Sequence, residues 1–271
     1  MNKVIAILIA STLLVACSTS PTGRSQLVFM PESQMITMGV QSFHKLLEET
    51  PRLEDAAINQ YVQCIGDAII QLPSVQVASS DWEIVVFDDS GANAFALPGG
   101  KIGVNKGLLS VATTPGQVAA VIGHEVGHVL AHHGNERVSQ AFAANQGLSL
   151  LEGWLGTTDY KNQGAIMSAL GVGTQVGVLL PFGRTQESEA DTIGVELMAR
   201  AGFDPEESVV LWQNMARNSR SGTPEFLSTH PSHATRIERL GKEAADAALL
   251  YHQSGRKPQC ELNKPPPPNK S

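Results

Sequence analysis

Residues 117–128 read QVAAVIGHEVGH, an apolar helical run that ends in the pattern His-Glu-x-x-His. Residues four apart share one face of a helix, so the imidazoles of His124 and His128 can point at one metal ion, with Glu125 beside them at its open side. This arrangement is chemically sufficient to activate a water molecule. The alternative is two surface histidines that flank a solvated glutamate, and a third ligand elsewhere in the chain would argue against it.

A hydrolytic zinc site of this type uses two histidines and one carboxylate, and its fourth position is left for water. His132 lies one turn farther along the helix and is poorly placed to reach a metal held by the first two histidines, and His133 is expected to point elsewhere. The longer metzincin pattern is excluded, because Ala131 and Gly134 stand where it requires glycine and histidine. The third ligand must therefore come from another segment.

A second predicted helix offers that ligand. Glu187 and Asp191 are four residues apart and share a face, while Glu189 projects to nearly the opposite side. We assign Glu187 as the third ligand, and Asp191 as the acceptor of the free ring N–H of a ligating histidine, with His124 as the favoured donor. The alternative is an acidic helix start that interacts with the helix dipole.

The hydrophobic periodicity of the remaining sequence is mostly that of helices, but near the middle it changes to that of strands. Helices are predicted over 31–49, 53–72, 115–150, 164–180, 185–200, 205–218 and 234–251. Short strands are predicted over 82–87, 92–97 and 101–104, with a tight turn between the last two. The sequence therefore predicts an α+β fold, predominantly helical, of the zincin type, with a small sheet of about three strands beside the His-Glu-x-x-His helix.

Composition limits the class of protein. The 271 residues are 42% hydrophobic, and no linker interrupts residues 31–255, which are expected to form one metallopeptidase domain before a C-terminal tail at 256–271. The net charge of −7 gives no basic surface for nucleic acid, so that partner is excluded. Three dispersed cysteines exclude a Cys-rich metal site.

The N-terminus is typical of an export signal. Residues 1–16 carry one early lysine and then an uncharged, mainly apolar run that is too short for a permanent membrane helix. The end of that run, Leu14-Val15-Ala16-Cys17, resembles the lipobox of bacterial lipoproteins, so Cys17 is the expected lipidation site, with an ordinary signal and an incidental cysteine as the alternative. Ser18 after it favours the outer membrane, with the chain facing the periplasm, and residues 17–30 are expected to be a lipidated end and flexible tether.

An uncharged segment and a pair of cysteines carry two further predictions. The segment 162–183 has no charged residue between Lys161 and Arg184, and its glycines and polar residues favour a buried or lid-forming hairpin over a membrane-inserted element. In an oxidising compartment Cys64 and Cys260 are expected to form a disulfide, and two unrelated buried thiols are the alternative.

Four motifs in order resemble one known family. They are HEVGH at 124–128, ESEAD at 187–191, NAFALPGG at 93–100 and STHPSHATR at 228–236. This set resembles the gluzincin metallopeptidases of the HtpX and CAAX prenyl protease type over about residues 22–252, and within them the periplasmic lipoprotein branch of LoiP and BepA. BepA-like members carry a long C-terminal repeat domain for which this sequence leaves no room, so the expected likeness is to LoiP.

The resemblance implies further roles. Asn93, Ala94 and Phe95 would lie at a sheet edge that pairs with an extended substrate, although a plain hairpin is the alternative. His230 would lie near the metal and either donate to the developing oxyanion or cap the zinc at rest, and Arg236 would contact substrate. The structural alternative is that Pro231 ends a loop before the last helix and that Arg236 anchors that helix.

These residues together predict a zinc-dependent endopeptidase of the bacterial cell envelope with one zinc ion per chain and Glu125 as general base. Its substrates would be misfolded or misassembled envelope proteins, and its candidate partners are the membrane, through the Cys17 lipid, and the outer-membrane assembly machinery. The competing hypothesis is a lipid-anchored chaperone or assembly factor with a latent zinc site, and a hydrolase of non-peptide esters is a third.

Overall fold

The computed structural model describes residues 17–76, 81–143, 183–218, 226, 230 and 235–262. The predicted signal at 1–16 and the uncharged segment at 162–182 lie outside these residues. Within the described part, none of the helices has both the length and the hydropathy that a membrane crossing requires.

Helices make up most of the structure, and their bounds follow the predicted periodicity. They are α2 (Glu32–Glu49), α3 (Ala56–Ile70), α4 (Pro73–Gln76), α5 (Pro115–Leu130), α8 (Arg184–Ala201), α9 (Glu206–Asn218) and α11 (Arg236–Ser254), with a 3-10 helix η1 at Lys106–Ser110. Residues 133–143 are also helical. The strands are β1 (Cys17–Thr19), β2 (Ser25–Leu27), β3 (Glu83–Phe87), β4 (Ala94–Leu97) and β5 (Lys101–Asn105). The predominantly helical α+β fold is therefore confirmed.

The predicted sheet has three strands in the order β3-β5-β4. Strand β5 pairs parallel with β3 and antiparallel with β4, with Ile102 opposite both Ile84 and Ala96. Among the described residues, β4 pairs with β5 on one side only, so its other edge has no strand partner there. Strand β4 also contacts the helix that carries the His-Glu-x-x-His pattern, and the backbone N–H of Ala96 reaches Glu125 of that helix.

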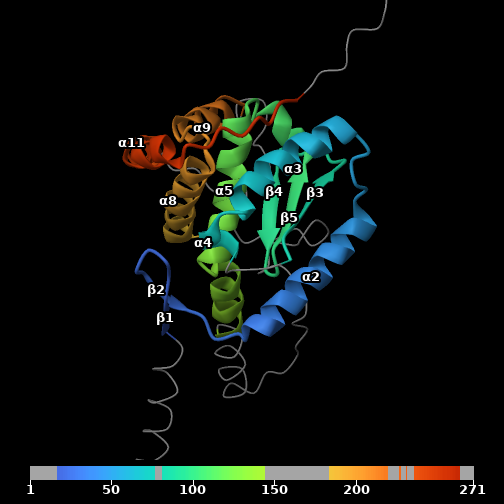
Figure 1. The fold of residues 1–271 in the computed structure, drawn as a ribbon. Coiled ribbons are helices and arrows are strands. Elements are labelled where there is room, and N and C mark those ends of the chain that lie inside the picture. Colours follow the sequence, from blue (N-terminus) through green and yellow to red (C-terminus); the bar gives the residue numbers. More distant parts are fainter. Residues whose placement is uncertain are drawn as a thin grey trace, which may run out of the picture.

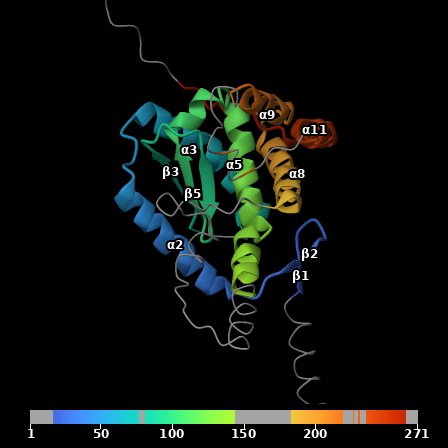
Figure 2. The same ribbon diagram turned by 180° about the vertical axis from the view of Figure 1, so that it is seen from behind.

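Helix α5 runs through the middle of the molecule, with the sheet on one side and α8, α9 and α11 on the other (Figures 1 and 2). The hydroxyl of Thr114 caps its start by accepting from the backbone N–H of Gln117, and Pro115 occupies the first turn. All residues from Gly116 to His128 are buried. The helix is therefore the centre of the core, and its polar side chains are shielded from water.

Glycines let α5 and α8 approach closely. A Cβ atom at Gly127 would lie 2.9 Å from the carbonyl oxygen of Ala190, and one at Gly194 would lie 2.7 Å from the backbone nitrogen of His124. Real Cβ atoms do not tolerate such contacts, so larger residues here would push the helices apart. The close approach is what brings the acidic face of α8 to the histidines of α5.

The predicted helix over 115–150 is wrong in one respect, because it breaks after Leu130. His132 has a φ of 53°, which lies in the left-handed region that non-glycine residues rarely adopt. The next helix begins at residue 133. The break turns His133 back toward α5, and residues 144–150 lie outside the described part.

The N-terminal segment also differs from the predicted flexible tether. Strands β1 and β2 form an antiparallel hairpin, with Ser18 opposite Gln26, and it lies beside α8 and the end of α5 (Figures 1 and 2). Arg24, in the hairpin loop, forms ion pairs with Glu136 and Glu189. These charge pairs fix a segment whose composition alone suggests a tether.

The C-terminal end is attached to the body of the fold. Cys260 is buried and forms a disulfide with Cys64 of α3, which encloses a sequence separation of 196 residues. The C-terminal tail is therefore held at Cys260, and residues 263–271 lie outside the described part.

Candidate active site and metal centre

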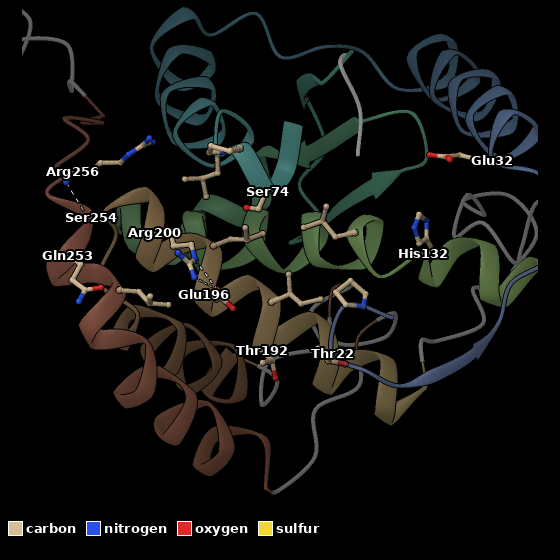
Figure 3. A pocket seen from close by; sticks show the side chains of 17 residues that line it. Thr22, Glu32, Ser74, His132, Thr192, Glu196, Arg200, Gln253, Ser254 and Arg256 are labelled. Atoms are coloured by element: carbon tan, nitrogen blue, oxygen red, sulfur yellow. Dashed lines mark hydrogen bonds and ion pairs between the residues drawn. The ribbon is translucent and has the colours of Figure 1, made fainter. Parts of the chain in front are cut away.

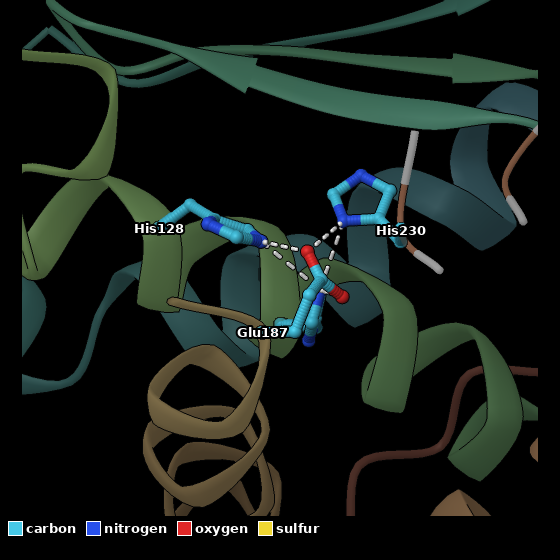
Figure 4. Close-up of side chains that lie close together, drawn as sticks. His128, Glu187 and His230 are labelled. Atoms are coloured by element: carbon cyan, nitrogen blue, oxygen red, sulfur yellow. Dashed lines mark hydrogen bonds and ion pairs between the residues drawn. The ribbon is translucent and has the colours of Figure 1, made fainter. Parts of the chain in front are cut away.

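Four buried side chains converge at the centre of the fold. His124 and His128 come from α5, Glu187 from the first turn of α8, and His230 from the segment before α11, and one ligand atom from each lies within 4.8 Å of the others. Figure 4 shows His128 and His230 on either side of the Glu187 carboxylate. The sequence predicted the first three as ligands and left two roles open for His230.

Distances within the cluster fit a tetrahedral metal ion. The Nε2 atoms of His124 and His128 are 3.1 Å apart, and each lies 3.5 Å from an oxygen of Glu187. His230 Nδ1 lies 3.2 Å from His124 Nε2 and 2.9 Å from Glu187 Oε1. Metal bonds of about 2.1 Å in a tetrahedron place ligand atoms about 3.4 Å apart, so these residues can hold such an ion with small adjustments.

The electrostatics of the cluster favour a bound cation. Burial alone would raise the pKa of Glu187, but the three surrounding imidazoles hold it well below its usual value. Burial alone would lower the pKa of His124, but hydrogen bonds to Asp191 and Glu187 raise it to about 9. Burial lowers the pKa of His128 well below its usual value. A metal cation bound here takes the place of the His124 proton, because a ligating imidazole must be neutral.

Glu125 lies beside the cluster, as the pattern predicts. Its side chain is buried, and Oε1 is 3.4 Å from His230 Nε2, with no hydrogen-bond partner among the described residues. The backbone N–H of Ala96 on β4 donates to the carboxylate, and burial raises the pKa of the Glu125 carboxyl. A carboxylate with one unpaired oxygen and a raised pKa is suited to accept a proton from water.

His124 is held on the side facing α11. Its Nδ1 lies 2.9 Å from Asp191 Oδ1, as the spacing on α8 predicts. Arg236 donates to both oxygens of Asp191, at 2.6 and 2.8 Å, and to Glu187 at 2.8 Å, and its guanidinium stacks over Trp212. The side chain of Arg236 is buried between two carboxylates and a ring, and its predicted contact with substrate stays a prediction.

His128 is held from the other side by residues that the sequence did not suggest. His128 Nδ1 lies 2.8 Å from Nδ1 of His133, and Nε2 of His133 lies 3.1 Å from Oε2 of Glu189. The expectation that His133 points elsewhere is wrong, because the break at His132 turns it inward. The only signal for this contact in the sequence was a histidine five residues after His128. In the uninterrupted helix that the sequence predicted, that histidine would lie on another face.

The predicted substrate segment borders the site through its backbone. The carbonyl of Asn93 accepts from the N–H of Asn105, so Asn93 and, two residues on, Phe95 turn their backbone groups toward β5. Ala94 and Ala96 then turn theirs toward the other edge of β4. The ring of Phe95 packs against Phe43 and Phe87 in a second core cluster, so it does not face the metal ligands.

A separate cleft of about 920 Å³ lies between α4, α8, α11 and the hairpin loop (Figure 3). Thr22, Thr192, Glu196 and Arg200 line it, together with residues of α11. None of the four candidate ligands is among its lining residues. The cleft is therefore distinct from the buried cluster of candidate ligands.

The family model for peptidase family M48 matches residues 56–244, which include the histidines of α5 and the carboxylates of α8. The chain belongs to peptidase family M48. The resemblance to gluzincins, drawn from four motifs, is thereby confirmed. The chain carries a metallopeptidase domain.

The curated relatives are proteases by their names, either mitochondrial metalloendopeptidases or beta-barrel assembly-enhancing proteases. "Mitochondrial metalloendopeptidase OMA1" of Saccharomyces cerevisiae is 32% identical over 85% of this chain and 70% of its own length. The human protein, "Metalloendopeptidase OMA1, mitochondrial", is 28% identical over 82% of this chain, and "Beta-barrel assembly-enhancing protease" of Escherichia coli is 27% identical over 82%. The chain spans 44% and 46% of the length of the last two.

Proposed function

We propose that this chain is a zinc-dependent endopeptidase of the bacterial cell envelope that cleaves misfolded or misassembled envelope proteins. The observation that carries the proposal is the buried set of His124, His128 and Glu187 with Glu125 beside it. The names of the relatives support a role in the quality control of membrane or envelope proteins.

His124, His128 and Glu187 would hold the zinc ion, since two imidazoles and a carboxylate are a common ligand set of hydrolytic zinc sites. When bound, zinc acidifies water and polarises a carbonyl group. Glu125 accepts the proton of the attacking water on its unpaired oxygen and then donates it to the amine nitrogen that leaves. The buried surroundings strengthen these electrostatic effects.

In this proposal His230 occupies the fourth position around the metal when no substrate is bound. Its Nδ1 lies among the ligand atoms, whereas a catalytic zinc site keeps one position open. We assign His230 as a cap that must withdraw before substrate enters. A cap predicts that His230→Ala raises peptide hydrolysis at saturating zinc, and an oxyanion donor predicts a loss of about 100-fold or more.

Substrate would bind as an extended strand on β4. Ala94 and Ala96 turn their backbone carbonyls outward, where they would accept from a peptide, while the N–H of Ala94 donates to Oδ1 of Asn93 and that of Ala96 donates to Glu125. A peptide paired at this edge would pass directly over the carboxylate that handles the proton.

The test is Glu125→Gln, which keeps the size of the side chain and removes its basicity. Casein hydrolysis should fall by about 100-fold or more while zinc content stays at one per chain. The matched control is Glu196→Gln, an exposed glutamate of α8 that pairs with Arg200. If Glu125→Gln keeps both zinc and hydrolysis, the role of Glu125 and the proposed reaction fail together.

A lipid-anchored chaperone or assembly factor is the second candidate, and the four-ligand arrangement with His230 favours it. Such a protein would use zinc to hold its fold and would show little hydrolysis. Complementation of a deletion strain separates the two, because a chaperone role survives Glu125→Gln and a proteolytic role does not.

Attachment to the outer membrane through a lipid on Cys17, with the chain facing the periplasm, completes the proposal. Contact with the outer-membrane assembly machinery is proposed from the name of the Escherichia coli relative. Palmitate labelling of cells should mark the protein and leave a Cys17→Ser variant unmarked.

A further inference from the structure

The hairpin loop between β1 and β2 contacts α8 next to the metal ligands. Thr22 Oγ1 donates to Oε1 of Glu189 at 2.5 Å, and Arg24 Nε donates to Oε2 of Glu189 at 2.8 Å. Figure 3 shows Thr22 on the loop where it passes α8. Glu189 is only 5% exposed, so its negative charge depends on these donors together with the hydroxyl of Ser20 and the ring of His133, which also hydrogen-bond to it.

From Glu189 the contacts continue to a metal ligand. Oε2 of Glu189 is 3.1 Å from His133 Nε2, and His133 Nδ1 is 2.8 Å from His128 Nδ1. His128 turns its other nitrogen, Nε2, toward His124 and Glu187. One continuous line of polar contacts therefore joins the N-terminal hairpin to the metal site.

The protonation of the two imidazole rings sets which atom donates and which atom accepts in each of these hydrogen bonds. When Nε2 of His128 binds a metal, its Nδ1 carries the proton and donates to His133 Nδ1. Because His133 accepts at Nδ1, the proton of its ring lies on Nε2, which is 3.1 Å from Oε2 of Glu189 and donates to it. Every donor then faces an acceptor, and the negative end of the line is Glu189.

Arg24, at the end of these contacts farthest from the metal ligands, is itself held in place. The guanidinium of Arg24 donates from Nη1 and Nη2 to the two oxygens of Glu136, both at 2.8 Å. Gln186 also donates to Glu136, at 2.7 Å. Such a bidentate pair fixes the plane of the guanidinium, and with it the direction of the Nε donor toward Glu189.

We propose that Arg24 and Thr22 of the hairpin, acting through Glu189 and His133, are positioning residues that orient His128 for metal binding. We call this set the hairpin support. It makes the N-terminal hairpin a part of the metal site, although it lies outside the residues that the family model matches. The proposal rests on the metal site alone, so a chain that binds zinc without cleaving peptides would leave it standing.

The experiment measures zinc affinity by competition with a chromophoric chelator, and the absorption bands of the cobalt(II)-substituted chain. Arg24→Ala should weaken zinc binding by about 10- to 100-fold and shift the cobalt bands. Arg24→Lys, which keeps the charge and one donor, should lie between Arg24→Ala and the unmodified chain. The matched control is Arg52→Ala, which removes an exposed arginine paired with Glu83 and should leave both readouts unchanged.

A smaller change keeps the test decisive if Arg24→Ala does not fold. Thr22→Val preserves shape and removes one hydrogen bond to Glu189, and should weaken zinc binding by about three- to tenfold. A lowered melting temperature with unchanged zinc affinity and cobalt spectrum would show that the hairpin only stabilises the fold. That result would overturn the proposal.

Discussion

His124 and His128 are one helical turn apart, yet they are held by opposite parts of the molecule. His124 faces Asp191, which Arg236 pairs with inside the helical core; we call these two residues the core support. His128 faces the hairpin support, which ends at Arg24 in the N-terminal hairpin. The Arg236 side chain is 2% exposed and that of Arg24 is 21% exposed. One ligand thus depends on the fold itself, and the other on a segment that docks against the fold.

The largest expected effect comes from the core support. Arg236→Met leaves the carboxylates of Asp191 and Glu187 buried without their shared cation, which should lower the free energy of unfolding by about 3 to 5 kcal/mol. Denaturant unfolding measures this. Arg200→Ala, which removes an exposed arginine from α8, should change it by about 1 kcal/mol or less. Equal losses in the two variants would contradict the importance assigned to the buried cation.

The disulfide is expected to stabilise the fold without acting on either support. Replacing Cys64 and Cys260 with serine should lower the free energy of unfolding by about 2 to 5 kcal/mol and leave zinc affinity unchanged. In the unmodified chain, denatured without reductant, thiol titration should find neither cysteine reactive. Two reactive thiols would show that the bond does not form.

Substitution of one carboxylate in each support compares them directly. Asp191→Asn and Glu189→Gln should each weaken zinc binding by about 10- to 100-fold, because each replaces a charged acceptor with a neutral amide, behind His124 directly in one case and behind His128 through His133 in the other. Asp191→Asn should also lower the melting temperature more, since it leaves Arg236 less fully paired in the core. Zinc titration and thermal unfolding of both variants make the comparison. If only Asp191→Asn changes zinc affinity, the hairpin support is not part of the site.

The smallest effect is expected at the exposed rim of the core support. Arg239 also reaches Asp191, but its side chain is 33% exposed. Arg239→Ala should cost about 1 kcal/mol or less in unfolding free energy and leave zinc affinity within a factor of about two. A loss of zinc affinity as large as that of Asp191→Asn would show that Arg239, and not Arg236 alone, orients this carboxylate.

The sequence was sufficient where the site depends on local helical geometry. His124, Glu125 and His128 follow from spacing on one helix, and Glu187 and Asp191 follow from spacing on a second. The three strands and most helix bounds also agree, because hydrophobic periodicity reports which face of each element is buried.

The features of the site that the sequence did not predict depend on contacts between distant segments. His133 faces the site only because the chain adopts a left-handed conformation at His132, and local propensity does not indicate a break there. Arg24 lies in a segment of tether-like composition, and its partners Glu136 and Glu189 are 112 and 165 residues away. Arg236 was predicted to contact substrate, and its ion-pair partners on α8 and its stacking ring on α9 were not foreseen. A backbone break decides the position of His133, and charge pairing across the fold decides those of Arg24 and Arg236, and spacing encodes neither.

The most direct test of the metal site is anomalous X-ray diffraction at the zinc edge from crystals of the zinc-loaded chain. A single strong peak should appear within about 2.2 Å of Nε2 of His124, Nε2 of His128 and an oxygen of Glu187, with one zinc per chain. The absence of a peak there, or a peak held by other residues, would contradict the assignment of this cluster as the metal centre.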